Sequence, residues 1–107
     1  MYIKSNDGFS YQFEGPLSPA NIKNISGIYA VTDRHFNGNL YLLDVGESSE
    51  LQDRIKNHDR KNQWENKRKG CIEFYIYYTP YKTAEDRLRI EHSIRAFYGN
   101  ENLCGER

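Results

Sequence analysis

The alternation of polar and aromatic residues over positions 1–14 predicts a β-hairpin at the start of the chain. Residues 6–8 read Asn-Asp-Gly, a sequence that favours a tight turn midway through this segment. The aromatic side chains expected to share one face of the hairpin are Phe9, Tyr11 and Phe13. Residues 15–19 contain one glycine and two prolines, and we therefore expect them to form a connector without regular structure.

Three further segments have the pattern of strands. Residues 27–33 and 40–46 are rich in apolar side chains and are separated by Asn37-Gly38, which predicts an antiparallel hairpin of two buried strands. Residues 71–79 show alternation and end before Pro80, which predicts a third strand. The side chains expected on one face of that strand are Ile72, Phe74, Ile76 and Tyr78.

A short helix is predicted after the second of these strands. Ser49 and Gln52 have the spacing of a capping box, in which side chains satisfy the first backbone N–H groups of a helix. Leu51 and Ile55 lie four residues apart and would point toward the core together. The polar stretch that follows, residues 60–70, predicts a loop.

A longer helix is predicted near the end of the chain. Thr83 and Asp86 have capping spacing at its start, and Gly99 provides a stop after about Tyr98. Glu91 lies at the shoulder of the apolar stripe of this helix, where its carboxylate would be half-buried. The residues of that stripe are Ile90, Ile94, Phe97 and Tyr98.

These elements together predict an α+β domain. We expect a small three-stranded antiparallel sheet flanked by helices in ββαβα order, with the N-terminal hairpin as an extension. Residues 1–25 would form the hairpin and connector, and residues 26–107 the main domain. A chain of 107 residues has the length of one compact domain.

The composition favours a cytoplasmic globular protein. Hydrophobic residues make up 37% and charged residues 28% of the chain, which lies within the range of folded soluble proteins. We expect no association with a membrane, because the sequence has neither a long apolar run nor a recognisable N-terminal signal. Cys71 and Cys104 lack zinc-site spacing and favour reduced thiols, with a disulfide between them left open. The formal net charge of zero requires any nucleic-acid surface to be local.

Residues that suggest chemistry recur at fixed spacing around the predicted two-stranded hairpin. The first strand begins with Gly27-Ile28-Tyr29, and the second ends with Asp44-Val45-Gly46. Leu51, Arg54 and His58 follow Gly46 at the fifth, eighth and twelfth positions, and Glu91 and Asn102 lie on or just after the last helix. This arrangement resembles the GIY-YIG nucleases over roughly residues 26–102. In that family a tyrosine usually stands where this chain has Asp44.

The resemblance implies a role for each of these residues. Hydrolysis of a phosphodiester needs an activated water, stabilisation of charge on the phosphoryl oxygens and assistance to the leaving oxygen. Glu91 would hold one Mg²⁺ or Mn²⁺ ion, and Arg54 would contact the scissile phosphate. Tyr29 and His58 would position or deprotonate the water, and which of them takes the proton stays open. Supporting roles would fall to Gly27, Gly46 and Asn102.

Asp44 is the main departure from the family pattern. A carboxylate in place of tyrosine changes both the hydrogen bonding and the charge beside Tyr29, so Asp44 is a candidate base or second acidic ligand. It is equally a candidate sign of lost activity. Tyr41 would not replace the missing tyrosine, since a residue three positions earlier on a strand faces the other side of the sheet.

A basic stretch follows the predicted catalytic arginine. Residues 54–69 contain seven basic side chains against Asp59 and Glu65, a charge pattern that favours contact with phosphates. Trp64 would be available to stack on a base. The candidate nucleic-acid-binding residues are Lys56, Arg60, Lys61, Lys67, Arg68 and Lys69.

Three functional hypotheses follow. The first is a metal-dependent endonuclease that hydrolyses DNA, with RNA as an open alternative and with specificity either weak or supplied by a protein partner. The second is a catalytically inactive GIY-YIG-like module that binds nucleic acid or a protein. The third is a small α+β interaction protein whose tyrosines serve packing.

Overall fold

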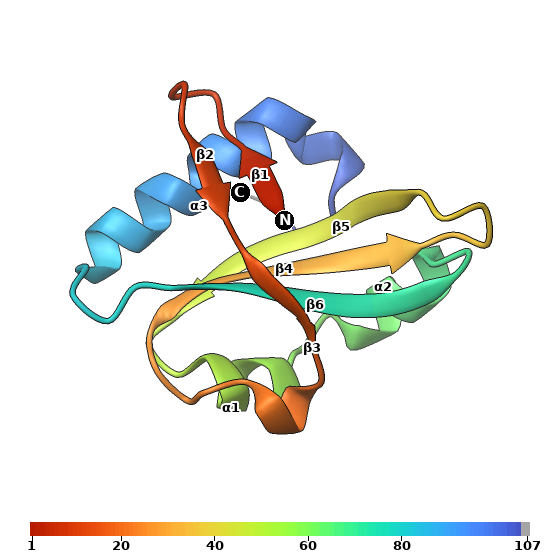
Figure 1. Ribbon diagram of the computed structural model, residues 1–107, viewed down its shortest axis with the longest axis horizontal. Coiled ribbons are helices and arrows are strands. Elements are labelled where there is room, and N and C mark those ends of the chain that lie inside the picture. Colours follow the sequence, from red (N-terminus) through yellow and green to blue (C-terminus); the bar gives the residue numbers. More distant parts are fainter. Residues whose placement is uncertain (106–107) are drawn as a thin grey trace.

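The computed structural model describes residues 1–105 and has an α+β fold (Figure 1). Within these residues, a four-stranded antiparallel sheet has the strand order β3-β6-β4-β5, and β1 pairs with β2 in a separate hairpin. The strands are β1 (Tyr2–Lys4), β2 (Ser10–Gln12), β3 (Glu14–Leu17), β4 (Gly27–Arg34), β5 (Leu40–Ser48) and β6 (Cys71–Tyr78). The helices are α1 (Leu51–Lys56), α2 (Lys61–Lys67) and α3 (Ala84–Tyr98), with short 3-10 helices η1 (Pro19–Asn21) and η2 (Asn100–Asn102).

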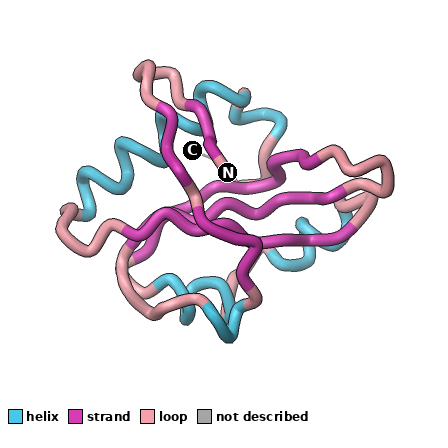
Figure 2. The backbone as a smooth tube through the Cα atoms, in the orientation of Figure 1, coloured by secondary structure: helices cyan, strands magenta, loops and turns pink. Residues whose placement is uncertain are grey.

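Helices cover both sides of the four-stranded sheet, as Figure 2 shows. α1 and α2 lie on one side, and α3 and the β1-β2 hairpin lie on the other (Figure 1). The buried apolar residues accordingly form two clusters. The cluster on the α1 and α2 side contains Ile22, Tyr29, Val31, Leu43, Leu51, Ile55, Trp64, Ile76 and Cys104. The cluster on the α3 side contains Ile3, Phe13, Ile28, Ala30, Val45, Tyr75, Ile90 and Ile94.

The three predicted strands of the sheet are confirmed as β4, β5 and β6. β4 lies between the other two, so that Tyr29 is paired with Gly46 on one side and with Ile76 on the other. The predicted N-terminal hairpin is also confirmed. The Tyr11 and Phe13 rings pack on Tyr77, with centroid distances of 5.3 and 5.6 Å, and the Phe9 ring lies 6.3 Å from that of Tyr11 but is 65% exposed.

The sheet has a fourth strand that the sequence did not predict. The expected connector contains β3, which pairs with β6 through Glu14 opposite Ile76 and Leu17 opposite Phe74. The register shifts between these two pairs, and the Gly15-Pro16 peptide within them is cis. A proline is compatible with a strand at the edge of a sheet, because its missing N–H removes only one ladder bond. The prediction of an irregular connector and a three-stranded sheet was therefore wrong.

The region between β5 and β6 differs from the predicted short helix and loop. Leu51 and Ile55 point inward on α1 as expected, but the Ser49 capping box is wrong, because Gln52 donates instead to the carbonyl of Pro19. The predicted loop over residues 60–70 contains α2. Burial of Trp64 explains why this polar segment is helical. Trp64 is 2% exposed and its ring packs against Phe74, so α2 is stabilised by tertiary contact and not by a local apolar stripe.

α3 agrees closely with the predicted last helix. The Thr83–Asp86 capping box is present, and Gly99 follows the helix with a φ of 86° that favours glycine. Ile90 and Ile94 are buried as expected, whereas Phe97 is 48% exposed and was wrongly placed in the apolar stripe. Glu91 is fully buried and not half-buried.

A β-bulge changes which residues of β5 share a face. Val31 pairs with Asp44, but the next residue of β4, Thr32, pairs with Leu42. This shift of one residue reverses the side-chain alternation of β5. Tyr41 therefore faces the same side of the sheet as Asp44, and the prediction that it faces the other side was wrong.

Two expectations drawn from the composition concern membranes and cysteines. Within residues 1–105, no helix combines the length and apolar character needed to cross a membrane. In the same part of the chain both cysteines are free, Cys71 at the surface and Cys104 in the core.

Candidate active site

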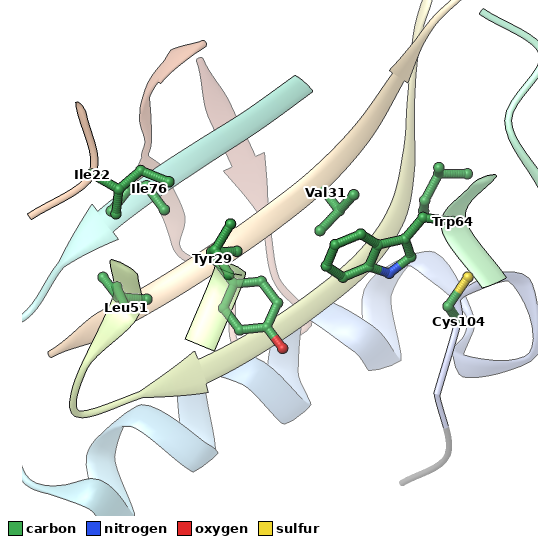
Figure 3. Packing of buried hydrophobic residues seen from close by; sticks show 9 residues of the cluster. Ile22, Tyr29, Val31, Leu51, Trp64, Ile76 and Cys104 are labelled. Atoms are coloured by element: carbon green, nitrogen blue, oxygen red, sulfur yellow. The ribbon is translucent and has the colours of Figure 1, made fainter. Parts of the chain in front are cut away.

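Tyr29 lies at the centre of the candidate site. Its side chain projects from the first half of β4 on the α1 and α2 side of the sheet, and its hydroxyl extends across β5 (Figure 3). Tyr29 is paired with Gly46, and a Cβ atom at position 46 would lie 2.1 Å from Tyr29 Oη. Only glycine leaves room for the ring, which supplies a physical reason for Gly46 at this position.

His58 reaches the same point from the segment after α1. Its Nε2 lies 2.5 Å from Tyr29 Oη, and the two rings meet edge-on with centroids 5.3 Å apart. Its Nδ1 accepts a hydrogen bond from the backbone N–H of Arg60 at 3.0 Å. The structure thus brings Tyr29 and His58 into direct contact, although His58 lies beyond the end of α1 and not on the helix itself.

Both members of this pair are neutral near pH 7. Burial raises the pKa of Tyr29 to about 12, with the Asp44 carboxylate as a second cause and Arg60 and Arg54 opposing it. Burial also lowers the pKa of His58 to about 4, with the positive charges of Arg54 and Arg60 acting in the same direction. The site therefore holds a phenol that keeps its proton beside an uncharged imidazole.

Arg54 forms the outer side of the site. Its guanidinium donates to Asp59 Oδ1 at 3.2 Å, and its side chain is 34% exposed. The same Asp59 oxygen lies 3.3 Å from His58 Nδ1, and the Asp59 side chain is 73% exposed. The Asp59 carboxylate therefore occupies the position beside Arg54 at which an anionic group of a ligand could bind.

Asp44 is fully buried and is surrounded by donors. It accepts bonds from Arg60 Nε at 2.8 Å and Nη2 at 3.2 Å, from Trp64 Nε1 at 2.8 Å and from Arg95 Nη2 at 3.1 Å. These four bonds match the four acceptor positions of a carboxylate. In this arrangement Asp44 joins α2 and α3 to β5, and acting as a base or metal ligand would require one of these bonds to break.

Glu91 lies on α3 and is fully buried. Its Oε2 is 3.8 Å from Arg95 Nε, and Arg95 in turn donates to Asp44. A chain of charged side chains thus leads from Glu91 through Arg95, Asp44 and Arg60 to the Tyr29 hydroxyl, which lies 3.5 Å from Arg60 Nη2. Within residues 1–105, His, Cys, Asp and Glu side chains do not form a group of three or more that could hold a metal ion.

Comparison with known proteins adds no family assignment. No family model, no curated protein and no solved structure matches this chain. The resemblance to GIY-YIG nucleases thus rests on the residues themselves, and a functional proposal has to be argued from their geometry.

Two of the predicted supporting residues have clear structural roles. A Cβ atom at Gly27 would lie 2.5 Å from the Tyr77 carbonyl oxygen, so glycine permits the close approach of β6 to the start of β4. Asn102 lies in η2, and its side-chain amide donates to the Tyr98 carbonyl at 3.1 Å, which closes the end of α3.

The predicted nucleic-acid-binding residues divide into two groups. The side chains of Arg60 and Trp64 point inward to Asp44, so in this conformation neither is available for a phosphate or a base. An open hollow of about 580 Å³ lies beside this region and includes Gln63 among its lining residues. The exposed members of the basic stretch are Lys56, Lys61, Lys67, Arg68 and Lys69.

Sequence reasoning missed the contribution of Arg60 and Arg95 to the interior of the site. Arg60 is predicted as a nucleic-acid-binding residue because it belongs to a basic stretch, and Arg95 is not among the predicted site residues. One signal was present: Asp44 follows a run of apolar strand residues, and a buried carboxylate requires charged or hydrogen-bonding partners. The sequence therefore indicates that Asp44 has hydrogen-bonding partners, but it does not identify them.

Proposed function

We propose that this chain is a cytoplasmic, single-domain endonuclease of the GIY-YIG type that hydrolyses phosphodiester bonds in DNA. The observation that carries the proposal is the contact between Tyr29 Oη and His58 Nε2 at 2.5 Å, directly above Gly46. Three residues that are far apart in the sequence, and that the family resemblance singled out, meet at one point. Packing alone would not require a tyrosine, a histidine and a glycine to do so.

Each residue near this point has a chemical role in the proposal. Arg54, at the outer side of the site, would bind the scissile phosphate through its planar guanidinium. Tyr29 would orient the attacking water by hydrogen bonding, and His58 would hold the Tyr29 hydroxyl in place for this role. Both are neutral near pH 7, so the proposal assigns them positioning and hydrogen bonding, not a permanent charge.

Glu91 is the residue that would hold a magnesium or manganese ion. A carboxylate suits this cation, which commonly takes one or two protein carboxylates and completes its coordination with water. Asp44 does not fit as a second ligand, because its oxygens already accept bonds from Arg60, Trp64 and Arg95. When bound, the ion would provide Lewis-acid stabilisation of charge on the phosphoryl oxygens.

The DNA backbone would lie along the exposed basic residues of α1 and α2. Lys56, Lys61 and Lys67 are exposed on these helices and lie on the side of the sheet that carries Tyr29. Such residues bind phosphates without reading sequence, so the proposal predicts weak sequence specificity or a separate partner that supplies it.

A plasmid-cleavage assay tests this function. Purified protein is incubated with supercoiled DNA and Mg²⁺ or Mn²⁺, together with Glu91→Gln and the matched control Glu85→Gln, which removes an exposed carboxylate from the same helix. We expect cleavage that falls by about 100-fold or more in Glu91→Gln and stays unchanged in Glu85→Gln. Equal cleavage by all three proteins would point to a contaminating nuclease and contradict the proposal.

The second candidate is a catalytically inactive module that binds nucleic acid. It is favoured by burial, since Tyr29 is 1% exposed, His58 is 5% exposed and Glu91 is fully buried. This candidate predicts salt-dependent DNA binding without cleavage under either metal ion. The Lys61→Ala and Lys67→Ala substitutions would then weaken binding while Glu91→Gln left it unchanged.

A further inference from the structure

Both ring nitrogens of His58 have a hydrogen-bond partner, and one of these partners has only one possible role. The backbone N–H of Arg60, 3.0 Å from Nδ1, can donate but cannot accept. Asp59 Oδ1 is also near Nδ1, at 3.3 Å, but the Arg60 N–H is closer, and we infer that Nδ1 acts as its acceptor and carries no proton. In a neutral imidazole the single proton is then on Nε2, the nitrogen that faces Tyr29.

This proton position determines how Tyr29 and His58 share their hydrogen bond. His58 Nε2–H donates, and Tyr29 Oη accepts at 2.5 Å. Arg60 Nη2, at 3.5 Å, is a second donor directed at the same oxygen. Because His58 and Arg60 both direct donors at Oη, the hydroxyl proton of Tyr29 has to point away from these two groups.

Arg60 is held in place by Asp44. Its Nε and Nη2 make two parallel bonds to the two Asp44 oxygens, at 2.8 and 3.2 Å, and its side chain is 10% exposed. This paired geometry restrains the guanidinium strongly. Because Arg60 is also the N-cap of α2, the same restraint keeps its backbone N–H directed at His58.

We propose that Asp44 and Arg60 form a positioning pair, which keeps the His58 proton on Nε2 and leaves the Tyr29 hydroxyl to donate a hydrogen bond, without transfer of its proton, to the attacking water. Asp44 would thus serve the site through Arg60 and not by direct contact with substrate. The consequence for catalysis rests on the proposed nuclease function. The proton position on His58 does not, and can be measured without activity.

The charges around His58 are consistent with this arrangement near pH 7. Arg54 on α1 and Arg60 at the start of α2 face the ring from two sides, and both disfavour an imidazolium. Asp44 on β5 and the exposed Asp59 act in the opposite direction, and Asp59 Oδ1 lies 3.3 Å from Nδ1. Once acid protonates the ring, Nδ1–H would donate to Asp59 and the Arg60 N–H would lose its acceptor.

The test is a long-range ¹H–¹⁵N correlation spectrum of the full-length labelled protein at pH 7, with His58→Gln used for assignment. We expect the His58 Nδ1 resonance in the range of an unprotonated nitrogen and the Nε2 resonance in the range of a protonated one. The reverse pattern, with the proton on Nδ1, would overturn the proposal. Neither outcome depends on whether the protein cuts DNA.

Two charge-matched variants separate the role of Arg60 from a general loss of positive charge. Arg60→Gln breaks the paired bonds to Asp44, so the two His58 nitrogens should shift toward an average of both tautomers. Lys67→Gln removes one charge from the same helix and should leave them unchanged. Unshifted His58 resonances in folded Arg60→Gln would refute the positioning role.

If Arg60→Gln does not fold, Arg60→Lys provides the same test. Lysine keeps the charge but cannot make two parallel bonds to a carboxylate. We expect a smaller shift in the same direction, and wild-type resonances in Arg60→Lys would also refute the role of the paired geometry.

Discussion

The two faces of the sheet use buried polar groups in different ways. On the α3 side, Ile28, Ala30 and Val45 form one apolar cluster with Ile90 and Ile94, and the charged residues that α3 also buries, Arg87, Glu91 and Arg95, lie outside this cluster. On the α1 and α2 side, polar groups of Tyr29, His58 and Asp44 are bonded to one another or to arginines inside the core. Apolar packing stabilises without specifying direction, whereas a buried hydrogen-bond network specifies the orientation of each member.

The consequence of this difference is a division of tasks within one small domain. The apolar face can tolerate changes of shape that keep its volume. The stability of the polar face depends on every hydrogen-bonding partner being present, because a buried charge without its partner lowers the free energy of unfolding.

Asp44→Ala should have the largest effect on stability. It leaves the Arg60 and Arg95 guanidinium groups without their shared carboxylate, and we expect a loss of about 3–5 kcal/mol in the free energy of unfolding measured with urea. Val45→Ala, the next residue on the opposite face, is the control and should cost about 2 kcal/mol. An Asp44→Ala loss no greater than that of Val45→Ala would remove the energetic contrast between the faces.

Gly46→Ala should be the next most damaging change. The new methyl group would lie 2.1 Å from Tyr29 Oη and 2.2 Å from Cζ, so the ring has to move away from His58. We expect a loss of about 1–3 kcal/mol in unfolding free energy and a large fall in cleavage.

A double-mutant cycle identifies the cause of the Gly46→Ala effect. In a Tyr29→Leu background the clash is absent, and Gly46→Ala should cost much less. An equal loss of unfolding free energy in both backgrounds would mean that Gly46 is needed for the strand backbone and not to make room for the Tyr29 ring.

Acid should destabilise the polar face through His58. Its folded pKa of about 4 is below its ordinary value of 6.5, so the unfolded chain binds more protons between these values. The stability contribution of neutral His58 is complete above about pH 6.5 and is lost as pH falls toward 4. We expect a decline of at most about 2 kcal/mol from pH 7 to pH 5, measured by urea unfolding.

His58→Gln is the control for this pH dependence. The variant should show a flatter stability profile between pH 7 and pH 5 than the wild-type protein. Identical profiles would mean that another group accounts for the acid sensitivity.

The smallest predicted effect concerns DNA binding at the outer side of the site. Asp59→Asn releases Arg54 from its carboxylate partner, and we expect DNA affinity to rise about two- to fivefold at low salt. Fluorescence anisotropy with a labelled duplex measures this change. Glu65→Gln, which removes the partner of Arg68, alters the net charge equally and should raise affinity less. An equal rise in DNA affinity in both variants would mean that Asp59 acts only through the net charge of the protein and not through its contact with Arg54.

Much of the fold was predictable from the sequence, because some segments carry strong local signals. β4, β5 and β6 have continuous or alternating apolar residues, and α3 has Thr83 at its start and Gly99 at its end. β3 and α2 have no such signals. The first contains a glycine and a proline, and the second is a polar segment held by the burial of Trp64.

The candidate site shows the same division between local signal and tertiary contact. The resemblance to the GIY-YIG pattern was enough to group Tyr29, Gly46 and His58. The structure brings these three together. Spacing could not show that Arg60 faces inward while its basic neighbours remain exposed.

Periodicity and capping act over a few residues, so the main elements and the residues available for chemistry could be predicted from the sequence. The role of Asp44 could not, because it depends on how distant segments pack together. Its partners Arg60, Trp64 and Arg95 lie 16, 20 and 51 residues away along the chain. A buried carboxylate binds whichever donors the packing brings within hydrogen-bond distance, and that depends on how β5, α2 and α3 meet.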